Sequence, residues 1–301
     1  KPFYPEFAEL IGSKADAAYQ EGVKKPGNCQ TASVLAPYIY EEDNWVDDME
    51  LGAIELYLFT GDRSYYDQAI EYARREPVTP WMGADSARHY QWYPFMNMGH
   101  YHIAKNGNER VNKEFVRNLR TGIERTLEKA MESPYRHGIP YIWCSNNLTT
   151  AMLTQCRLYR ELTGDDTYAE MEASLRDWLF GCNPWGTSMI VELPAHGDYP
   201  SQPHSSYLNA GKGNTTGGLV DGPVYFNIFK HLEGVNMDGI PNRPGDDYAR
   251  FQPDLMVYHD AIGDYSTNEP TMDGTACLTY YLSSLESDGA KQAAKQTSKK
   301  K

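Results

Sequence analysis

The chain has 301 residues, of which 41% are hydrophobic and 23% are charged, and its formal net charge is -13 at pH 7. This length and hydrophobic content are sufficient for a large folded core. The negative charge argues against nucleic-acid binding, because phosphate backbones repel acidic proteins. No run of about 18 consecutive apolar residues occurs, so we expect no membrane-spanning helix.

Hydrophobic residues recur with a period of about 3.6 along most of the chain, which is typical of helices that pack one face against a core. In the stretch 44–60, for example, Val46, Met49, Ala53 and Tyr57 fall on one face. We therefore expect an all-α fold. The expected helices lie at about 6–22, 44–60, 64–75, 88–105, 111–132, 147–163, 167–180 and 271–285.

Two short motifs separate consecutive expected helices. The sequence TGD at 60–62 and again at 163–165 follows one helical stretch and precedes another. Glycine adopts the left-handed conformation that ends a helix, and aspartate can cap the helix that follows. We therefore expect helical hairpins at both places, and their spacing favours an array or toroid of such hairpins.

Residues 181–270 differ from the rest of the chain, because Gly, Pro, Asn and Asp are dense there and the helical period fades. Long loops of this kind commonly carry function on a rigid scaffold. The last residues, 289–301, are rich in Lys and show no core pattern. We expect them to form a disordered tail.

The densest group of candidate catalytic side chains lies just before the last expected helix, where Asp264, Tyr265 and Glu269 are close in sequence. Pro270 suits the first position of that helix, which would place Glu269 at its cap. A carboxylate at a helix start can simply complement the helix dipole, which lowers its pKa. Burial beside another carboxylate such as Asp264 would raise the pKa instead, as a general acid requires. The residues by themselves leave both interpretations open.

The segment 264–269, DYSTNE, resembles the closing signature of glycoside hydrolase family 9, a family of cellulases. Five further segments resemble motifs of this family and follow in its order. The resemblance implies an (α/α)6 toroid of helical hairpins with long cleft-forming loops, in which residues 1–288 form a catalytic domain that lacks its first helices. The five segments are 44–62, 141–146 (YIWCSN), 181–188 (GCNPWGTS), 199–204 (YPSQPH) and 217–223 (GGLVDGP).

The resemblance also implies roles for single residues. Glu269 takes the position of the general acid that protonates the departing glycosidic oxygen. His204 and Tyr265 match positions that contact the sugar, and Trp143 matches an aromatic platform on which a sugar ring stacks. By their places in the same motifs, Asp264 and Asn147 are also assigned to substrate binding.

The sequence departs from the family pattern in three places. Ser205 and Ser206 follow His204 where the family has Arg, and Asn147 also stands in place of Arg. The N-terminal DxGD-type motif, which supplies the water-activating Asp, is absent, so the chain resembles the C-terminal two-thirds of the family domain. The implied mechanism is inverting, with the acid and base carboxyls about 6.5–9.5 Å apart. The base is not found in this chain.

The resulting expectation is a glycoside hydrolase that cleaves β-linked glucan, with β-1,4 linkage and endo action favoured. Its partner is a polysaccharide or oligosaccharide, and because a polymer cannot cross a membrane we expect a secreted or periplasmic protein. One alternative is an exo-acting hydrolase of oligosaccharides or amino sugars. The missing base favours a second, a glycan-binding protein without activity, and the hairpins alone allow a third, a scaffold for protein partners.

We expect that no cofactor is required. One cluster of acids is nevertheless a candidate site for a structural metal. Asp43, Asp47, Asp48 and Glu50 gather at the start of one expected helix. Oxygen ligands of this kind suit Ca²⁺, and the resemblance implies a Ca²⁺ near this helix, with Asp47 and Asp48 as the candidate ligands. Acids are also favoured at helix starts for their interaction with the dipole alone.

Overall fold

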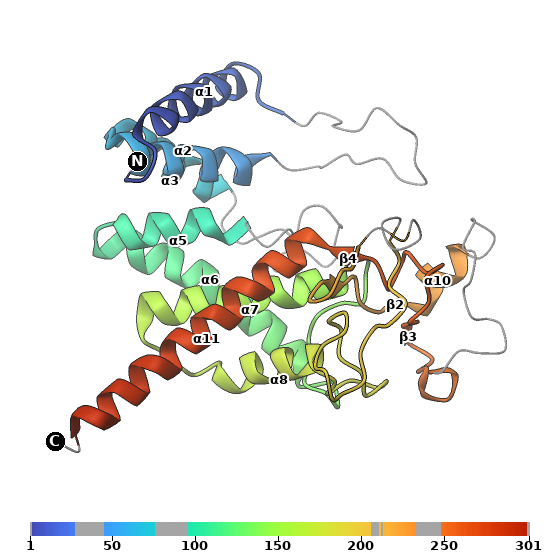
Figure 1. The fold of residues 1–301 in the computed structure, drawn as a ribbon. Coiled ribbons are helices and arrows are strands. Elements are labelled where there is room, and N and C mark those ends of the chain that lie inside the picture. Colours follow the sequence, from blue (N-terminus) through green and yellow to red (C-terminus); the bar gives the residue numbers. More distant parts are fainter. Residues whose placement is uncertain are drawn as a thin grey trace. The chain divides into compact units, whose positions relative to one another are not determined.

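The computed structural model describes residues 2–27, 45–75, 96–205, 211, 213–232 and 248–299 (Figure 1). Within these ranges the chain is mostly helical, and no described helix is long and apolar enough to cross a membrane. The chain divides into two compact units. Unit 1 comprises Lys1–Glu124 and Leu158–Gly164, and unit 2 comprises Arg125–Arg157 and Asp165–Lys301.

The helices of unit 1 confirm the helices predicted from the hydrophobic period of the sequence. Its core contains Ile54, Tyr66, Ile103 and Phe115, all completely buried. Of the helix expected at 88–105, the structure describes the part from Met96 onward, and residues 88–95 lie outside the described ranges. The helices are α1 (Pro5–Lys24), α2 (Val46–Thr60), α3 (Arg63–Arg75), α5 (Met96–Asn106) and the first part of α6 (Glu109–Ala130).

Both TGD motifs form the expected joints. Gly61 ends α2 in the left-handed conformation with φ 78°, and Asp62 accepts a hydrogen bond from the Ser64 main chain (2.9 Å) at the start of α3. Gly164 has φ 71°, and Asp165 accepts from the Thr167 main chain (3.0 Å). Because a residue with a Cβ is strained at positive φ, glycine suits both turns.

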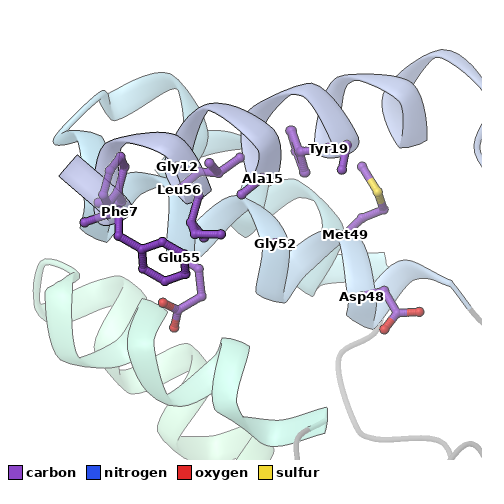
Figure 2. Close-up of a pocket in the computed structure, with 13 residues that line it drawn as sticks. Phe7, Gly12, Ala15, Tyr19, Asp48, Met49, Gly52, Glu55 and Leu56 are labelled. Carbon is purple, nitrogen blue, oxygen red and sulfur yellow. The ribbon is translucent and has the colours of Figure 1, made fainter. Parts of the chain in front are cut away.

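A groove of about 580 Å³ lies between α1 and α2 (Figure 2). Phe7 of α1 and Leu56 and Glu55 of α2 line it. Gly12 lets α1 approach α2 here, because a Cβ at this position would lie 2.2 Å from a ring carbon of Phe59.

Unit 2 combines helices with short strands that organise the segment 181–270. Strand β1 (Leu219–Val220) pairs with β4 (Pro270–Thr271), and β2 (Val224–Tyr225) pairs with β3 (Met256–Val257), both antiparallel. These pairs fix loops that are distant in sequence. The helical elements of unit 2 are α7 (Ser145–Thr163, up to Arg157), α8 (Ala169–Leu179), α10 (Phe226–Leu232), η2 (Ala249–Phe251) and α11 (Met272–Lys299).

An aromatic cluster forms part of the interior of unit 2. Trp178 is completely buried, and its ring stacks on that of His137 with centroids 4.0 Å apart. Trp185 packs edge-on against both Trp178 and Tyr258. The cluster thus links α8 to the loops on either side of the candidate site.

The start of the last helix differs from the prediction. Pro270 is not the first residue of the helix but lies in β4 opposite Val220, and α11 begins at Met272. Val220 and Pro270 are paired without a hydrogen bond from Val220, because the Val220 N–H donates to Met189 O at 3.0 Å instead. A proline, which has no N–H, is therefore tolerated at this position of the strand. Glu269 is therefore held by strand pairing and is not a helix cap.

The C-terminal segment also differs from the prediction. Residues 289–299, expected to be disordered, continue α11 as an exposed helix (Figure 1). The segment is built mainly of Ala, Lys and Gln, which are strong helix formers. Adding turns to an existing helix is easier than nucleating one, so the packed part of α11 favours its continuation.

Candidate active site

Asp264 organises the loop that carries the candidate acid. Its side chain is completely buried, and it accepts hydrogen bonds from the main chain of Ser266 (2.9 Å) and Thr267 (3.1 Å) and from both hydroxyls (2.6 and 2.8 Å). His259 Nδ1 lies 2.7 Å from Oδ2, which also accepts the hydrogen bond of the Thr267 hydroxyl. No part of the side chain is exposed and its oxygens accept hydrogen bonds within the loop, so Asp264 shapes the loop, and its contact with substrate stays a prediction.

The next residue, Tyr265, lies between two other predicted site residues. Its ring centroid is 5.9 Å from that of Trp143 and 5.9 Å from that of His204. All three side chains are partly exposed, and the Tyr265 hydroxyl has no hydrogen-bond partner among the described residues. The structure thus brings together the three aromatic residues expected to contact a sugar.

His204 is held against the Glu269 loop from both its main chain and its ring. Its N–H donates to Asn268 O at 2.9 Å, and its Nδ1 lies 2.7 Å from Ile262 O. The carbonyl oxygen can only accept, so Nδ1 is the donor of this hydrogen bond. The orientation of the ring is therefore fixed by the neighbouring loop.

Asp260 was not identified from the sequence, yet it anchors the loop that leads to His204. It accepts hydrogen bonds from Ser201 N and Oγ and from Gln202 N, each at 2.8 Å. It also accepts from the completely buried Asn268 side chain at 3.1 Å. Its partners at 201 and 202 are about 60 residues away along the chain, so no local pattern in the sequence marks the contact.

Glu269 itself is exposed, and its main chain is fixed by the neighbouring strand. Asp221 N donates to Glu269 O at 2.9 Å. Protein atoms around the carboxyl group raise its pKa by partial desolvation, and the positive charge of His204 opposes the shift. A raised pKa is what a general acid requires, and its cause here is desolvation and not the charge of Asp264.

Asn147, predicted to bind substrate, makes hydrogen bonds within the fold. The side chain is 3% exposed, accepts a hydrogen bond from Thr271 Oγ1 (2.8 Å) and donates one to Asp273 Oδ2 (3.1 Å). Gly274 permits this packing, because a Cβ there would lie 2.1 Å from Asn147 Oδ1. The Asn147 amide therefore joins the start of α7 to that of α11, and substrate binding by Asn147 stays a prediction.

The segment that carries Trp143 is bound to the loop 219–223. Asn146 donates from its main chain to Asp221 O (2.9 Å) and from its side chain to Val220 O (2.8 Å), and Ser145 Oγ donates to Pro223 O (2.7 Å). The same loop binds the main chain of Glu269, so it links the segment of Trp143 to that of Glu269. Asp221, at the centre of this arrangement, was missed as a site residue.

The acids expected to bind Ca²⁺ lie in unit 1, at the start of α2. Burial, and then the charge of Asp48, raise the pKa of Asp47 to about 6. Glu50 is completely buried with its carboxyl 2.6 Å from His100 Nδ1, and Asp43 lies outside the described residues. In the part of the chain that the structure describes, no three His, Cys, Asp or Glu residues are grouped to hold a metal. The described residues alone thus do not complete a ligand set, and Ca²⁺ binding by Asp47 and Asp48 stays a prediction.

Several solved structures share the fold of this chain. An endoglucanase of glycoside hydrolase family 9 named J30 has a TM-score of 0.69 at 20% identity over 93% of this chain and 50% of its own. A single mutant of a thermostable endoglucanase from Alicyclobacillus acidocaldarius has a TM-score of 0.68 at 19% identity over 94% and 51%. A family 9 protein of Bacteroides ovatus has a TM-score of 0.59 at 20% identity over 85% and 42%. The chain therefore spans about half the length of these proteins or less.

The sequence matches none of the curated proteins with which it was compared. The solved structures show that the helices adopt the (α/α)6 barrel fold expected from the sequence motifs. A sequence profile of glycosyl hydrolase family 9 matches residues 1–282, which is most of the chain. The chain therefore belongs to glycosyl hydrolase family 9.

Proposed function

We propose that the protein is a glycoside hydrolase that cleaves β-linked glucan, with β-1,4 linkage and endo action, and that Glu269 is its general acid. The observation that carries the proposal is the placement of Glu269, an exposed carboxyl two residues beyond a loop held by Asp264 and adjacent to His204, and partial desolvation there raises its pKa. Two similar structures are named endoglucanases, and a third, AaCel9A, is in complex with a cellobiose-like isofagomine. These names support a β-glucan as substrate.

In the proposed reaction, Glu269 gives its carboxyl proton to the glycosidic oxygen as the bond from that oxygen to the anomeric carbon breaks. A base-activated water attacks the same carbon from the opposite face, so its configuration inverts. The faces of Trp143 and Tyr265 offer stacking surfaces for sugar rings. Among the described residues, Asp221 and Asp264 are too buried to activate this water, and the base stays unassigned.

The test is the release of reducing ends from soluble β-1,4-glucan by the wild-type chain and by Glu269→Gln. Release by the wild type and its loss in Glu269→Gln are expected, because Gln has no proton to donate. Glu132→Gln, which alters an exposed glutamate in unit 2, is the matched control and should behave as the wild type. Release that persists in Glu269→Gln would contradict the assignment of the acid.

A second candidate function is glycan binding without cleavage. The observation that favours it is the burial of Asp221 and Asp264, two carboxyl groups close to Glu269 in the fold, since neither can serve as the base. This function predicts retention on immobilised glucan, no release of reducing ends, and equal binding by Glu269→Gln. Under either function a polymeric substrate places the protein outside the cytoplasm, in the secreted or periplasmic space.

A further inference from the structure

A second carboxyl group, that of Asp221, lies next to the candidate acid. The register of β1 and β4 pairs Leu219 with Thr271 and Val220 with Pro270. One position further, Asp221 stands opposite Glu269, and its N–H donates to Glu269 O at 2.9 Å. Side chains opposite each other in an antiparallel pair share one face, with Cβ atoms about 4.5–5.5 Å apart. Asp221 and Glu269 are therefore neighbours in space.

The surroundings of Asp221 favour its neutral form. The side chain is 1% exposed, Oδ1 accepts a hydrogen bond from the Cys144 thiol at 3.2 Å, and Oδ2 has no partner among the described residues. Burial raises its pKa well above the usual range, and the charges of three acids, Glu269, Asp264 and Asp273, raise it further, while the Cys144 hydrogen bond acts in the opposite direction. The charged groups named here as acting on Asp221 are all acids. An ionised carboxylate in this position would be costly.

We propose that Asp221 is a positioning residue for Glu269: it remains a carboxylic acid and donates a hydrogen bond from Oδ2 to the carboxylate that Glu269 becomes. This inference rests on the proposed function. The proton that leaves Glu269 goes to the glycosidic oxygen, Asp221 keeps its own proton throughout, and Glu269 regains a proton from water after each turnover.

The geometry allows this hydrogen bond to form when it is needed. The Glu269 side chain is exposed, and its carboxyl has no hydrogen bond to any described residue, so it is free to turn toward Oδ2. Asp221 itself is held in place by Cys144 and by its main-chain bonds to Asn146 and Glu269. A rigid donor beside a movable carboxylate stabilises the charge that develops on the acid as its proton leaves.

The protonation state of Asp221 can be tested without any activity. Below a pH of about 4 the group is neutral in both the folded and the unfolded chain. As the pH rises above this value only the unfolded chain ionises, so a protonated Asp221 lowers the stability of the fold progressively. The melting temperature of Asp221→Asn should therefore equal that of the wild type near pH 4 and exceed it increasingly toward pH 7. Asp254→Asn, which alters an exposed aspartate, is the control and should show no such trend.

A wild type that is more stable than Asp221→Asn at pH 7, by a margin that grows with pH, would overturn the proposal, because it would show an ionised Asp221. The hydrogen bond to Glu269 is tested by carboxyl NMR titration, which also needs no activity. The pKa of Glu269 should be higher in Asp221→Ala than in the wild type and in Asp221→Asn, since a donor stabilises the charged form. An unchanged pKa in Asp221→Ala would contradict the hydrogen bond.

Kinetics complete the test if the wild type hydrolyses β-glucan. Asp221→Ala should lower kcat about 10- to 100-fold, the effect of one hydrogen bond to a charged group, at an unchanged KM. Asp221→Asn keeps an N–H donor and should lower kcat only about threefold, without moving the pH profile. Equal losses in both variants would overturn the proposal. If the wild type releases no reducing ends, the proposed function fails, while the stability and NMR results still decide the state of Asp221.

Discussion

The main-chain N–H of His204 donates to the carbonyl oxygen of Asn268, the residue immediately before the candidate acid, at 2.9 Å. This bond joins the loop 199–204 to the loop 258–269, which are more than 50 residues apart in sequence. The side chain of Asn268 adds a second bond to the same loop, to Gln202 O at 2.9 Å. The position of His204 near Glu269 is thus fixed by loop-to-loop contacts and not by a helix.

Replacing His204 should change the pH range of activity. A general acid works while it is protonated, so activity is lost as the pH rises through the pKa of Glu269. The positive charge of His204 lowers that pKa. His204→Asn should therefore move the alkaline limit of kcat/KM to higher pH. His196→Asn, at an exposed histidine, is the control, and a limit that stays in place or moves to lower pH would contradict the interpretation.

Asp260→Ala should lower kcat/KM more than expected for a partly exposed side chain. The variant loses the acceptor for three hydrogen bonds from residues 201 and 202, and each such bond to a charged group contributes about 1.5–3 kcal/mol. We expect a decrease in kcat/KM of about tenfold or more, measured on soluble β-glucan beside Asp254→Ala. Equal activity of the two variants would show that the loop holds its position without Asp260.

Asn147 should affect stability and not substrate binding. Asn147→Ala removes the hydrogen bonds of the amide to Thr271 and Asp273 and should lower the free energy of unfolding by about 1–3 kcal/mol. Gly274→Ala introduces a Cβ 2.1 Å from Asn147 Oδ1 and should also destabilise the fold. The double variant should lose less stability than the sum of the losses in the two single variants. A raised KM in Asn147→Ala at unchanged stability would support the substrate-binding interpretation.

His137 should make the protein sensitive to acid. The ring is buried and stacked on Trp178, and burial lowers its pKa to about 3. An unfolded histidine binds a proton at a pH of about 6.5, so the stability due to the neutral ring is present above 6.5 and is lost as the pH falls toward 3. The loss is on the order of 4 kcal/mol. Denaturant titrations between pH 7 and 4 should show a smaller decrease for His137→Phe than for the wild type, and parallel decreases would contradict this role.

The sequence predicted what depends on local pattern. The helical periods located the helices, and the TGD joints at 60–62 and 163–165 form as expected. The grouping of Trp143, Tyr265 and His204 came from the family resemblance, because no local signal indicates that residues 143 and 265 meet. The family resemblance thus named these three residues, and the structure places the ring of Tyr265 next to those of Trp143 and His204.

The helix start expected at Pro270 was wrong, and the contacts of Asn147 and Asp264 were not predicted, for one physical reason: they depend on residues distant in sequence. Whether Asn147 or Asp264 faces a substrate depends on which groups satisfy its hydrogen bonds, and the partner of Asn147 is 124 residues away. Pro270 reads as a helix start because helix signals are local, whereas the strand that captures it lies at 219–220. Asp221 and Asp260 were missed for the same reason, since their importance depends on contacts across the chain.

The pairing of β1 with β4 limits how this family member can vary its loops. Side chains alternate between the two faces of a strand, so a slip of one residue in the register would exchange the faces of Asp221 and Glu269 with those of their neighbours. An insertion or deletion within 219–221 or 269–271 would turn the acid away from solvent even with every residue type retained. We therefore expect natural and engineered changes of loop length to fall outside these two short segments.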